Sequence, residues 1–197
     1  MKHQIRDEFR YVLIFVAVIW AVFIVDTLVP AFDLNQWGLV PRQFGGLLGI
    51  PLMPFLHGGV GHIASNTVPL VVLLVLMAGS RTRTWETVAE ITILGGALLW
   101  IFGRSQTSSG QTLSHVGASG LIYGLIAFLI VAGFREKRIL SLVIALGVGF
   151  FFGATLLFGV IPRNNGVSWD GHLCGAIAGA ALAYLTLGKN RAESTES

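Results

Sequence analysis

This chain has 197 residues, of which 54% are hydrophobic and 12% charged, and its mean hydropathy is +0.75. Soluble domains are about a quarter charged, so this composition excludes an ordinary soluble domain. The pI near 9.4 does not indicate nucleic-acid binding, because the basic residues form short clusters between apolar runs, where they suit a membrane surface. The single cysteine, Cys174, excludes a disulfide within the chain.

The apolar runs predict an all-α membrane protein with six spanning helices. A helix that crosses a bilayer needs about 20 mostly apolar residues, and runs of this kind recur along the chain. In chain order, the predicted spans are 11–29, 62–79, 84–103, 117–134, 139–161 and 171–187. They define a domain over 11–187 with polar tails at 1–10 and 188–197, and we expect the second tail to be disordered.

The connection between the first two spans has a mixed character. It covers 31–61 and contains three prolines, yet it is largely apolar over 44–56. Such a segment is too interrupted to span a bilayer and too apolar for a solvated loop. We therefore expect it to lie at the membrane interface or partly inside the membrane.

The distribution of basic residues predicts the orientation in the membrane. Six spans place both termini on one side, and ten Lys and Arg residues then lie on that side against three on the other. The positive-inside rule therefore predicts that both termini are cytoplasmic. The ten are Lys2, Arg6, Arg10, Arg81, Arg83, Arg135, Lys137, Arg138, Lys189 and Arg191, and the three are Arg42, Arg104 and Arg163.

Spans two, four and six all begin at the outer face, and each begins with a polar side chain capable of chemistry. His62 and Asn66 lie four residues apart, on one face of span two. Ser119 begins span four, and His172 begins span six. Polar residues inside a bilayer are costly and are functional-site hypotheses by default. Because these four lie at the same depth, we expect them to share one pocket that opens outward.

Small residues indicate which spans meet. Span six carries a glycine at every fourth position over 171–179, and span four carries Gly117, Gly120 and Gly124. Small residues let membrane helices approach closely, although they can serve packing alone. If the two stripes face each other, the serine of span four comes within reach of the histidine of span six. An imidazole beside a serine can activate it as a nucleophile, and the polar groups of span two would then donate to an oxyanion.

Three motifs together resemble the rhomboid intramembrane serine proteases, in the form of a prokaryotic six-span core. They are Gly117-Ala118-Ser119-Gly120, Gly171-His172 with the glycines that follow, and His62-x-x-x-Asn66 preceded by His57. The resemblance extends over nearly the whole chain. It implies a serine endopeptidase of the cell membrane, acting without metal or cofactor on the transmembrane segments of other membrane proteins.

The resemblance also implies roles for single residues. Ser119 would be the nucleophile and His172 the base of a dyad with no acidic third member. His62, Asn66 and the Ser119 backbone N–H would form the oxyanion hole. Tyr123 matches the family tyrosine whose ring stacks on the catalytic histidine.

His57 matches an additional histidine of the family and is expected to make a structural hydrogen bond.

The chain departs from the family in two places. Many members carry a Trp-Arg pair in the first loop, where this chain has Leu48-Gly49. Many also carry a glutamate in span two, near the position where this chain has Ala78. Both are structural features, so their absence concerns the anchoring of the first loop and not the chemistry.

Other interpretations stay open. The main alternative is a non-catalytic rhomboid-like protein, either a binder of membrane proteins or a transporter. Asp170 lies two residues before His172 and is expected to cap span six rather than to complete a Ser-His-Asp triad. His115 is expected to be an ordinary loop residue. The physiological substrate and the oligomeric state do not follow from the sequence.

Overall fold

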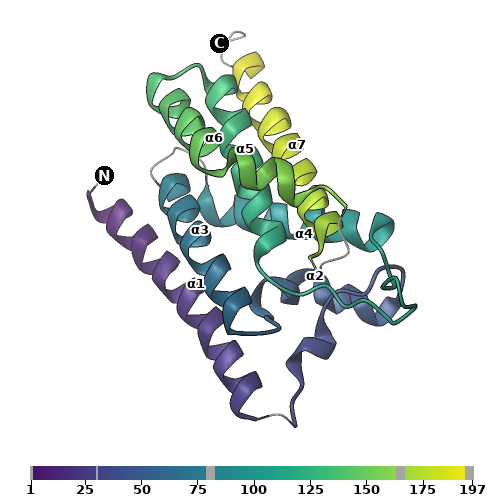
Figure 1. Cartoon of the computed structure of the whole chain (residues 1–197). Helices are drawn as coiled ribbons and strands as arrows, with labels where there is room; N and C mark the ends of the chain where they lie inside the picture. The colour runs from purple at the N-terminus through teal and green to yellow at the C-terminus, as the bar shows by residue number, and fades with distance from the viewer. Residues whose placement is uncertain (1, 30, 79–82, 163–166, 194–197) are drawn as a thin grey trace.

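The computed structural model describes residues 2–29, 31–78, 83–162 and 167–193, and no β-strand occurs among them. The long helices are α1 (Lys2–Leu28), α3 (Val60–Ala78), α4 (Thr84–Phe102), α5 (Ser119–Glu136), α6 (Ile139–Gly159) and α7 (Trp169–Glu193). Four short helical turns lie between α1 and α3, namely η1 (Leu34–Trp37), η2 (Phe44–Leu48), α2 (Gly49–Leu52) and η3 (Met53–Phe55). The predicted all-α class is therefore confirmed (Figure 1).

Between residues 11 and 187, the ends of the long helices lie within a few residues of the ends of the predicted spans. Within the described ranges, α1 from Arg6, α3, α4, α5 and α6 are long and apolar enough to cross a membrane. The remaining long helix, α7, is not among them, so five of the six predicted spans meet this criterion within the described residues. Helix α7 begins with polar residues and packs against α5 and α4. Residues 2–10 and 188–193 extend α1 and α7, whereas the sequence predicts tails there. Lys, Arg, Glu and Ala propagate a helix in water, so hydropathy marks the bilayer crossing and not the helix end.

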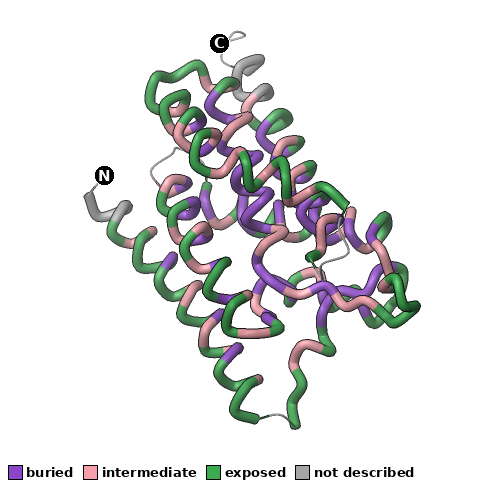
Figure 2. Tube along the Cα trace, viewed as in Figure 1, coloured by how far each residue is buried: buried purple, intermediate pink, exposed green. Residues whose placement is uncertain are grey.

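Helix α5 forms the centre of the bundle. Its apolar stretch is 61% buried, whereas that of α1 is 17% buried and that of α6 is 11% buried (Figure 2). It packs most extensively against α7, then against α6, and it also contacts α4 and α3. A helix that is apolar on every side suits such a central position. The outward faces of α1 and α6 are also apolar, which suits contact with lipid tails.

The predicted contact of the glycine stripes is confirmed for Gly120 and Gly124 of α5, which lie against Gly175 and Gly179 of α7, whereas Gly117 faces α3 instead. A Cβ added to Gly175 would overlap the backbone at Gly120, and one added to Gly179 would overlap the backbone at Gly124. There is no room for a side chain at these positions, so the two helix backbones are in direct contact. This contact brings the first turn of α7 beside the first turn of α5.

Replacing Gly175 with alanine is expected to lower the free energy of unfolding by about 1–3 kcal/mol, because the added methyl group must push α7 away from α5. Thermal unfolding in detergent measures this loss. Gly147→Ala in α6 is the matched control, since nothing lies within 4 Å of the Cβ it would add. Alanine there is expected to leave the Tm unchanged or slightly raised. Equal Tm values for the two variants would contradict direct backbone contact between α5 and α7.

The first loop is anchored to the end of α4 by groups other than the Trp-Arg pair of the family. The Nη1 of Arg42 donates to the carbonyl oxygens of Ile101 at 3.1 Å and Gly103 at 2.7 Å. The indole N–H of Trp100 donates to the carbonyl oxygen of Gln43 at 2.9 Å. The Arg42 guanidinium thus satisfies carbonyl groups at the C-terminal end of α4, which a helix leaves without partners. A different arginine and a different tryptophan therefore hold this loop.

Candidate active site

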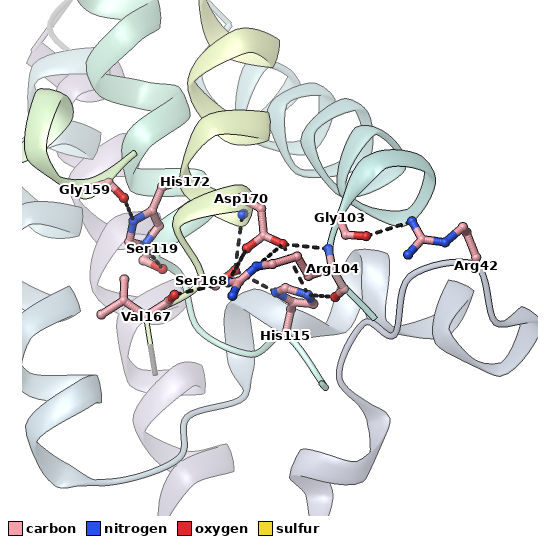
Figure 3. A network of polar contacts seen from close by, with 11 residues as sticks. Arg42, Gly103, Arg104, His115, Ser119, Gly159, Val167, Ser168, Asp170 and His172 are labelled. Atoms are coloured by element: carbon pink, nitrogen blue, oxygen red, sulfur yellow. Dashed lines mark hydrogen bonds and ion pairs between the residues drawn. The ribbon is translucent and has the colours of Figure 1, made fainter. Parts of the chain in front are cut away.

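Ser119 and His172 belong to different helices and meet in a hydrogen bond. Ser119 is the first residue of α5, and His172 lies in the first turn of α7. The close contact of these two helices brings the side chains together, with Ser119 Oγ 2.9 Å from His172 Nε2 (Figure 3). A serine hydroxyl within hydrogen-bond reach of an imidazole is the arrangement from which a base can activate a nucleophile.

Two further groups orient the ring of His172. Its Nδ1 lies 2.9 Å from the carbonyl oxygen of Gly159, the last residue of α6. Because a carbonyl can only accept, Nδ1 carries the proton, and the neutral ring leaves Nε2 free to accept from Ser119. Tyr123 stacks on the ring, with centroids 4.0 Å apart and an interplanar angle of 8°. The Tyr123 hydroxyl in turn donates to the carbonyl oxygen of Thr155 at 2.9 Å.

The polar residues of α3 lie beside this pair and are joined to His57. The Asn66 amide nitrogen lies 3.1 Å from His57 Nε2, and the rings of His57 and His62 pack edge to face with centroids 5.0 Å apart. Burial, together with the neighbouring His62, lowers the pKa of His57 to about 4. The His57 ring therefore stays neutral near pH 7 and can accept the Asn66 hydrogen. An amide NH₂ has two hydrogens, so this bond leaves one for another acceptor.

Gly117 lets the chain before α5 approach α3. Its φ of 111° lies in the left-handed region that favours glycine. A Cβ added at this position would lie 2.5 Å from His62 Nε2 and 3.5 Å from Asn66 Nδ2. The Gly117 N–H donates to the carbonyl oxygen of Met53 at 2.8 Å, which holds the segment in place. A side chain at this position would separate Ser119 from the polar residues of α3.

Ser119, His172, His62 and Asn66 line one cavity of about 700 Å³. The cavity wall also includes hydroxyl groups, from Ser65, Thr107, Ser108, Ser114 and Ser168. A cavity of this size that contains several polar groups can hold water, unlike a purely apolar void. The structure therefore brings together the four polar residues that the sequence singles out at the starts of spans two, four and six. Among the described residues, no group of three His, Cys, Asp or Glu side chains could hold a metal ion.

Asp170 does not cap α7, and that expectation is wrong. The cap is Ser168, whose Oγ accepts a hydrogen bond from the Gly171 N–H at 3.2 Å. The Asp170 carboxylate instead pairs with Arg104, at 3.1 Å between Nη2 and Oδ1. Residues two apart in a helix do not face each other, so Asp170 and His172 point to different sides.

His115 lies in the loop before α5, as expected, but it is not an ordinary loop residue. Its side chain is buried, with Nε2 2.9 Å from the carbonyl oxygen of Arg104 and Nδ1 2.7 Å from Ser168 Oγ. Burial lowers the pKa of His115, which keeps the ring neutral near pH 7. Its partners lie elsewhere in the sequence, so no local pattern could have revealed this role.

The comparisons with known proteins identify a family. The family model described as "Rhomboid domain" matches residues 44–189. "Uncharacterized protein Rv1337" of Mycobacterium tuberculosis and "Uncharacterized protein Mb1372" of Mycobacterium bovis are each 42% identical to this chain over 179 residues, covering 88% of this chain and 73% of the relative. "Uncharacterized protein ML1171" of Mycobacterium leprae is 41% identical over 179 residues, covering 88% of this chain and 69% of the relative. The matched residues include α3 to α6, most of α7 and all the cavity residues described above, so this chain belongs to the rhomboid family of multi-pass membrane proteins.

Proposed function

We propose that this chain is an intramembrane serine endopeptidase, which hydrolyses peptide bonds in or near the transmembrane segments of other membrane proteins. The observation that carries the proposal is the 2.9 Å hydrogen bond between Ser119 Oγ and His172 Nε2, beside a cavity that hydroxyl, imidazole and amide groups help to line. Membership of the rhomboid family supports it, because members of this family are usually intramembrane serine proteases.

In the acylation step, Ser119 Oγ attacks the scissile carbonyl carbon while His172 Nε2 takes the hydroxyl proton. The carbonyl electron pair moves to the oxygen, and the resulting oxyanion accepts hydrogen bonds from His62, the free amide hydrogen of Asn66 and the Ser119 N–H. The bond from Nδ1–H to Gly159 keeps the imidazolium oriented. Nε2–H then protonates the leaving amine nitrogen, the C–N bond breaks, and the acyl group stays on Ser119.

In the deacylation step, water from the cavity attacks the acyl carbonyl carbon. His172 accepts a proton from this water and returns it to Ser119 Oγ as the ester bond breaks, which releases a carboxylic acid and restores the free serine. The hydroxyl groups that line the cavity provide hydrogen bonds for the water. No step requires a metal ion or a cofactor.

The cavity also suggests a substrate class. The backbone of a transmembrane helix is hydrogen-bonded throughout, so the helix must unwind locally to present a carbonyl group. We therefore expect substrates to carry Gly, Pro or polar residues near the cut. We expect a small residue on the acyl side, because the backbone of Gly58 and Gly59, which carry no side chain, forms part of the cavity wall.

The proposed orientation places this chemistry at the outer side of a prokaryotic cell membrane. The start of α1 and the end of α7 lie toward the same end of the bundle, away from the loop between α1 and α3 (Figure 1). The basic clusters lie on the side of the termini, so the positive-inside rule makes that side cytoplasmic. The cavity then opens to the opposite, outer side.

Asn66→Ala is expected to lower kcat by about 10²-fold, because one oxyanion donor is typically worth this much. The variant is expected to remain reactive toward a serine-directed phosphonate, since Ser119 and His172 keep their own hydrogen bond. Steady-state kinetics on a single-span substrate measure the first effect, and gel fluorescence measures the second. An unchanged kcat would remove Asn66 from the proposed oxyanion hole.

The proposed function is tested with the purified protein in detergent. We expect a fluorophosphonate to label Ser119, as identified by mass spectrometry of the labelled peptide, and to leave the other serines of the cavity unlabelled. In parallel, we expect cleavage of some members of a panel of single-span substrates, and no cleavage after labelling. A non-catalytic binder or a transporter predicts neither the adduct nor the cleavage, and that result would overturn the proposal.

A further inference from the structure

Four polar side chains that take no part in the proposed proton transfers join three segments of the chain near Ser119 and His172 (Figure 3). We refer to Arg104, His115, Ser168 and Asp170 as the clasp. Arg104 follows the end of α4, His115 precedes the start of α5, and the other two residues lie at the start of α7. These contacts link segments that are distant in the sequence.

The first half of the clasp is the ion pair of Arg104 and Asp170. The Arg104 backbone N–H and Nε donate to Asp170 Oδ2 at 2.8 and 3.3 Å, and Nη2 donates to Oδ1 at 3.1 Å. Asp170 is only 5% exposed, and a buried carboxylate is tolerated when it is paired and hydrogen-bonded. The Arg104 guanidinium also lies over the Trp169 ring, 5.0 Å from its centroid. Arg104 therefore contacts two successive residues in the first turn of α7.

The second half of the clasp joins His115 to the cap of α7. His115 Nε2–H donates to the carbonyl oxygen of Arg104, so the neutral ring accepts the Ser168 hydroxyl hydrogen at Nδ1. Ser168 in turn accepts the Gly171 N–H at its Oγ and the His172 N–H at its carbonyl oxygen, at 3.2 and 3.0 Å. The position of the His172 backbone is thus linked to His115 through a single serine.

The clasp connects the two segments that carry the proposed dyad. His115 lies four residues before Ser119, and Asp170 lies two residues before His172. The first turn of a helix is its least constrained part, because its N–H groups have no partners within the helix. Gly159 and Tyr123 hold the His172 ring, but the ring can stay in place only if the backbone of this turn does.

We infer that Arg104 and Asp170 are positioning residues, whose ion pair holds the first turn of α7 so that His172 stays within hydrogen-bond reach of Ser119. The inference rests on the proposed function. Arg104 also lines the cavity, where it could contact substrate. The test must therefore distinguish a positioning role from substrate binding. A group that only binds substrate affects KM, whereas a misplaced base lowers kcat.

The test uses Arg104→Ala in the full chain, with a single-span substrate that the wild-type protein cleaves. We expect kcat to fall about 10- to 100-fold, because a displacement of about 1 Å in a catalytic group costs up to this much. KM is expected to stay within about twofold. The rate of fluorophosphonate labelling at Ser119 is expected to fall with kcat, and Arg104→Lys, which keeps a positive charge beside Asp170, is expected to recover part of the loss.

Arg135→Ala is the control, since Arg135 also lies over an aromatic ring of α7, but toward the other end of α5 and α7 and without an ion pair to that ring's neighbours among the described residues. Its Nη2 donates to the carbonyl oxygen of Tyr184 at 3.2 Å, and its guanidinium lies 4.2 Å from the Tyr184 ring centroid. We expect this variant to keep the wild-type kcat even where its Tm falls. Equal losses of kcat in the Arg104 and Arg135 variants would show a general loss of stability and would overturn the inference.

A change in KM alone, or a wild-type kcat in Arg104→Ala, would also overturn the inference. If Arg104→Ala fails to fold because Asp170 is left as an unpaired buried charge, Arg104→Ala with Asp170→Asn removes that charge and carries the same test. A wild-type kcat in this double variant overturns the inference. The proposed function is tested separately: if it is wrong, the wild-type protein is neither labelled at Ser119 nor able to cleave a substrate. That result would overturn the inference as well.

Discussion

Ser119→Ala is expected to lose cleavage of every single-span substrate that the wild-type protein cuts. The substitution removes one oxygen atom, Ser119 Oγ, which is hydrogen-bonded to His172 Nε2 at 2.9 Å. Without it no acyl-enzyme can form, and only binding and the oxyanion donors remain. The expected loss in kcat is about 10⁴–10⁶-fold, the scale on which removal of the nucleophile acts in serine proteases.

Cleavage is measured by gel mobility and mass spectrometry of the products, and folding by Tm in the same detergent. Ser109→Ala is the control, because Ser109 is an exposed serine of the loop before α5, bonded to Thr107 at 2.9 Å. It is expected to cleave at the wild-type rate. If Ser119→Ala cleaves at that rate too, Ser119 is not the nucleophile and the proposed mechanism is wrong.

His172→Ala is expected to cause a loss of similar size, about 10⁴–10⁶-fold in kcat, because the base and nucleophile of a serine protease act as a unit. Ser119 keeps its hydroxyl in this variant but has no group to accept the proton. Fluorophosphonate labelling of Ser119 is therefore expected to fall together with cleavage. This separates His172 from Asn66, whose removal is expected to leave labelling intact.

The double variant Ser119→Ala with His172→Ala provides the internal control for this prediction. It is expected to be no less active than either single variant, because each single change already removes the function of the pair. Additive losses would mean that the two residues act independently. Labelling of His172→Ala at the wild-type rate would mean that another group activates Ser119.

The geometry also explains how the proposed dyad could act without an acidic third member. In a Ser-His-Asp triad the carboxylate fixes the tautomer of the imidazole. Here the Gly159 carbonyl oxygen accepts from His172 Nδ1–H and fixes the same tautomer. The nearby Asp170 carboxylate is bound to Arg104 and is therefore not available for that purpose.

Much of this fold can be predicted from local patterns, for a physical reason. Each bilayer crossing requires its own run of about 20 apolar residues, so α6 (Ile139–Gly159) is recognisable without knowledge of its neighbours. Glycines at every fourth position fall on one helix face, which is why the contact of α5 with α7 follows from their spacing. The polar residues that begin α3, α5 and α7 are recognisable because they interrupt or border apolar runs.

The groups that hold the candidate site in place have no local signature. The partner of His172 Nδ1 is a backbone carbonyl, and every residue has one. Arg104 and Asp170 are 66 residues apart, so no spacing rule connects them. Ser168 and not Asp170 caps α7, because the helix begins at Trp169. These contacts depend on how α4, α5 and α7 pack together, which is a property of the whole chain. Hydropathy and spacing therefore locate the reactive residues, while the bonds that orient them exist only once the helices have packed.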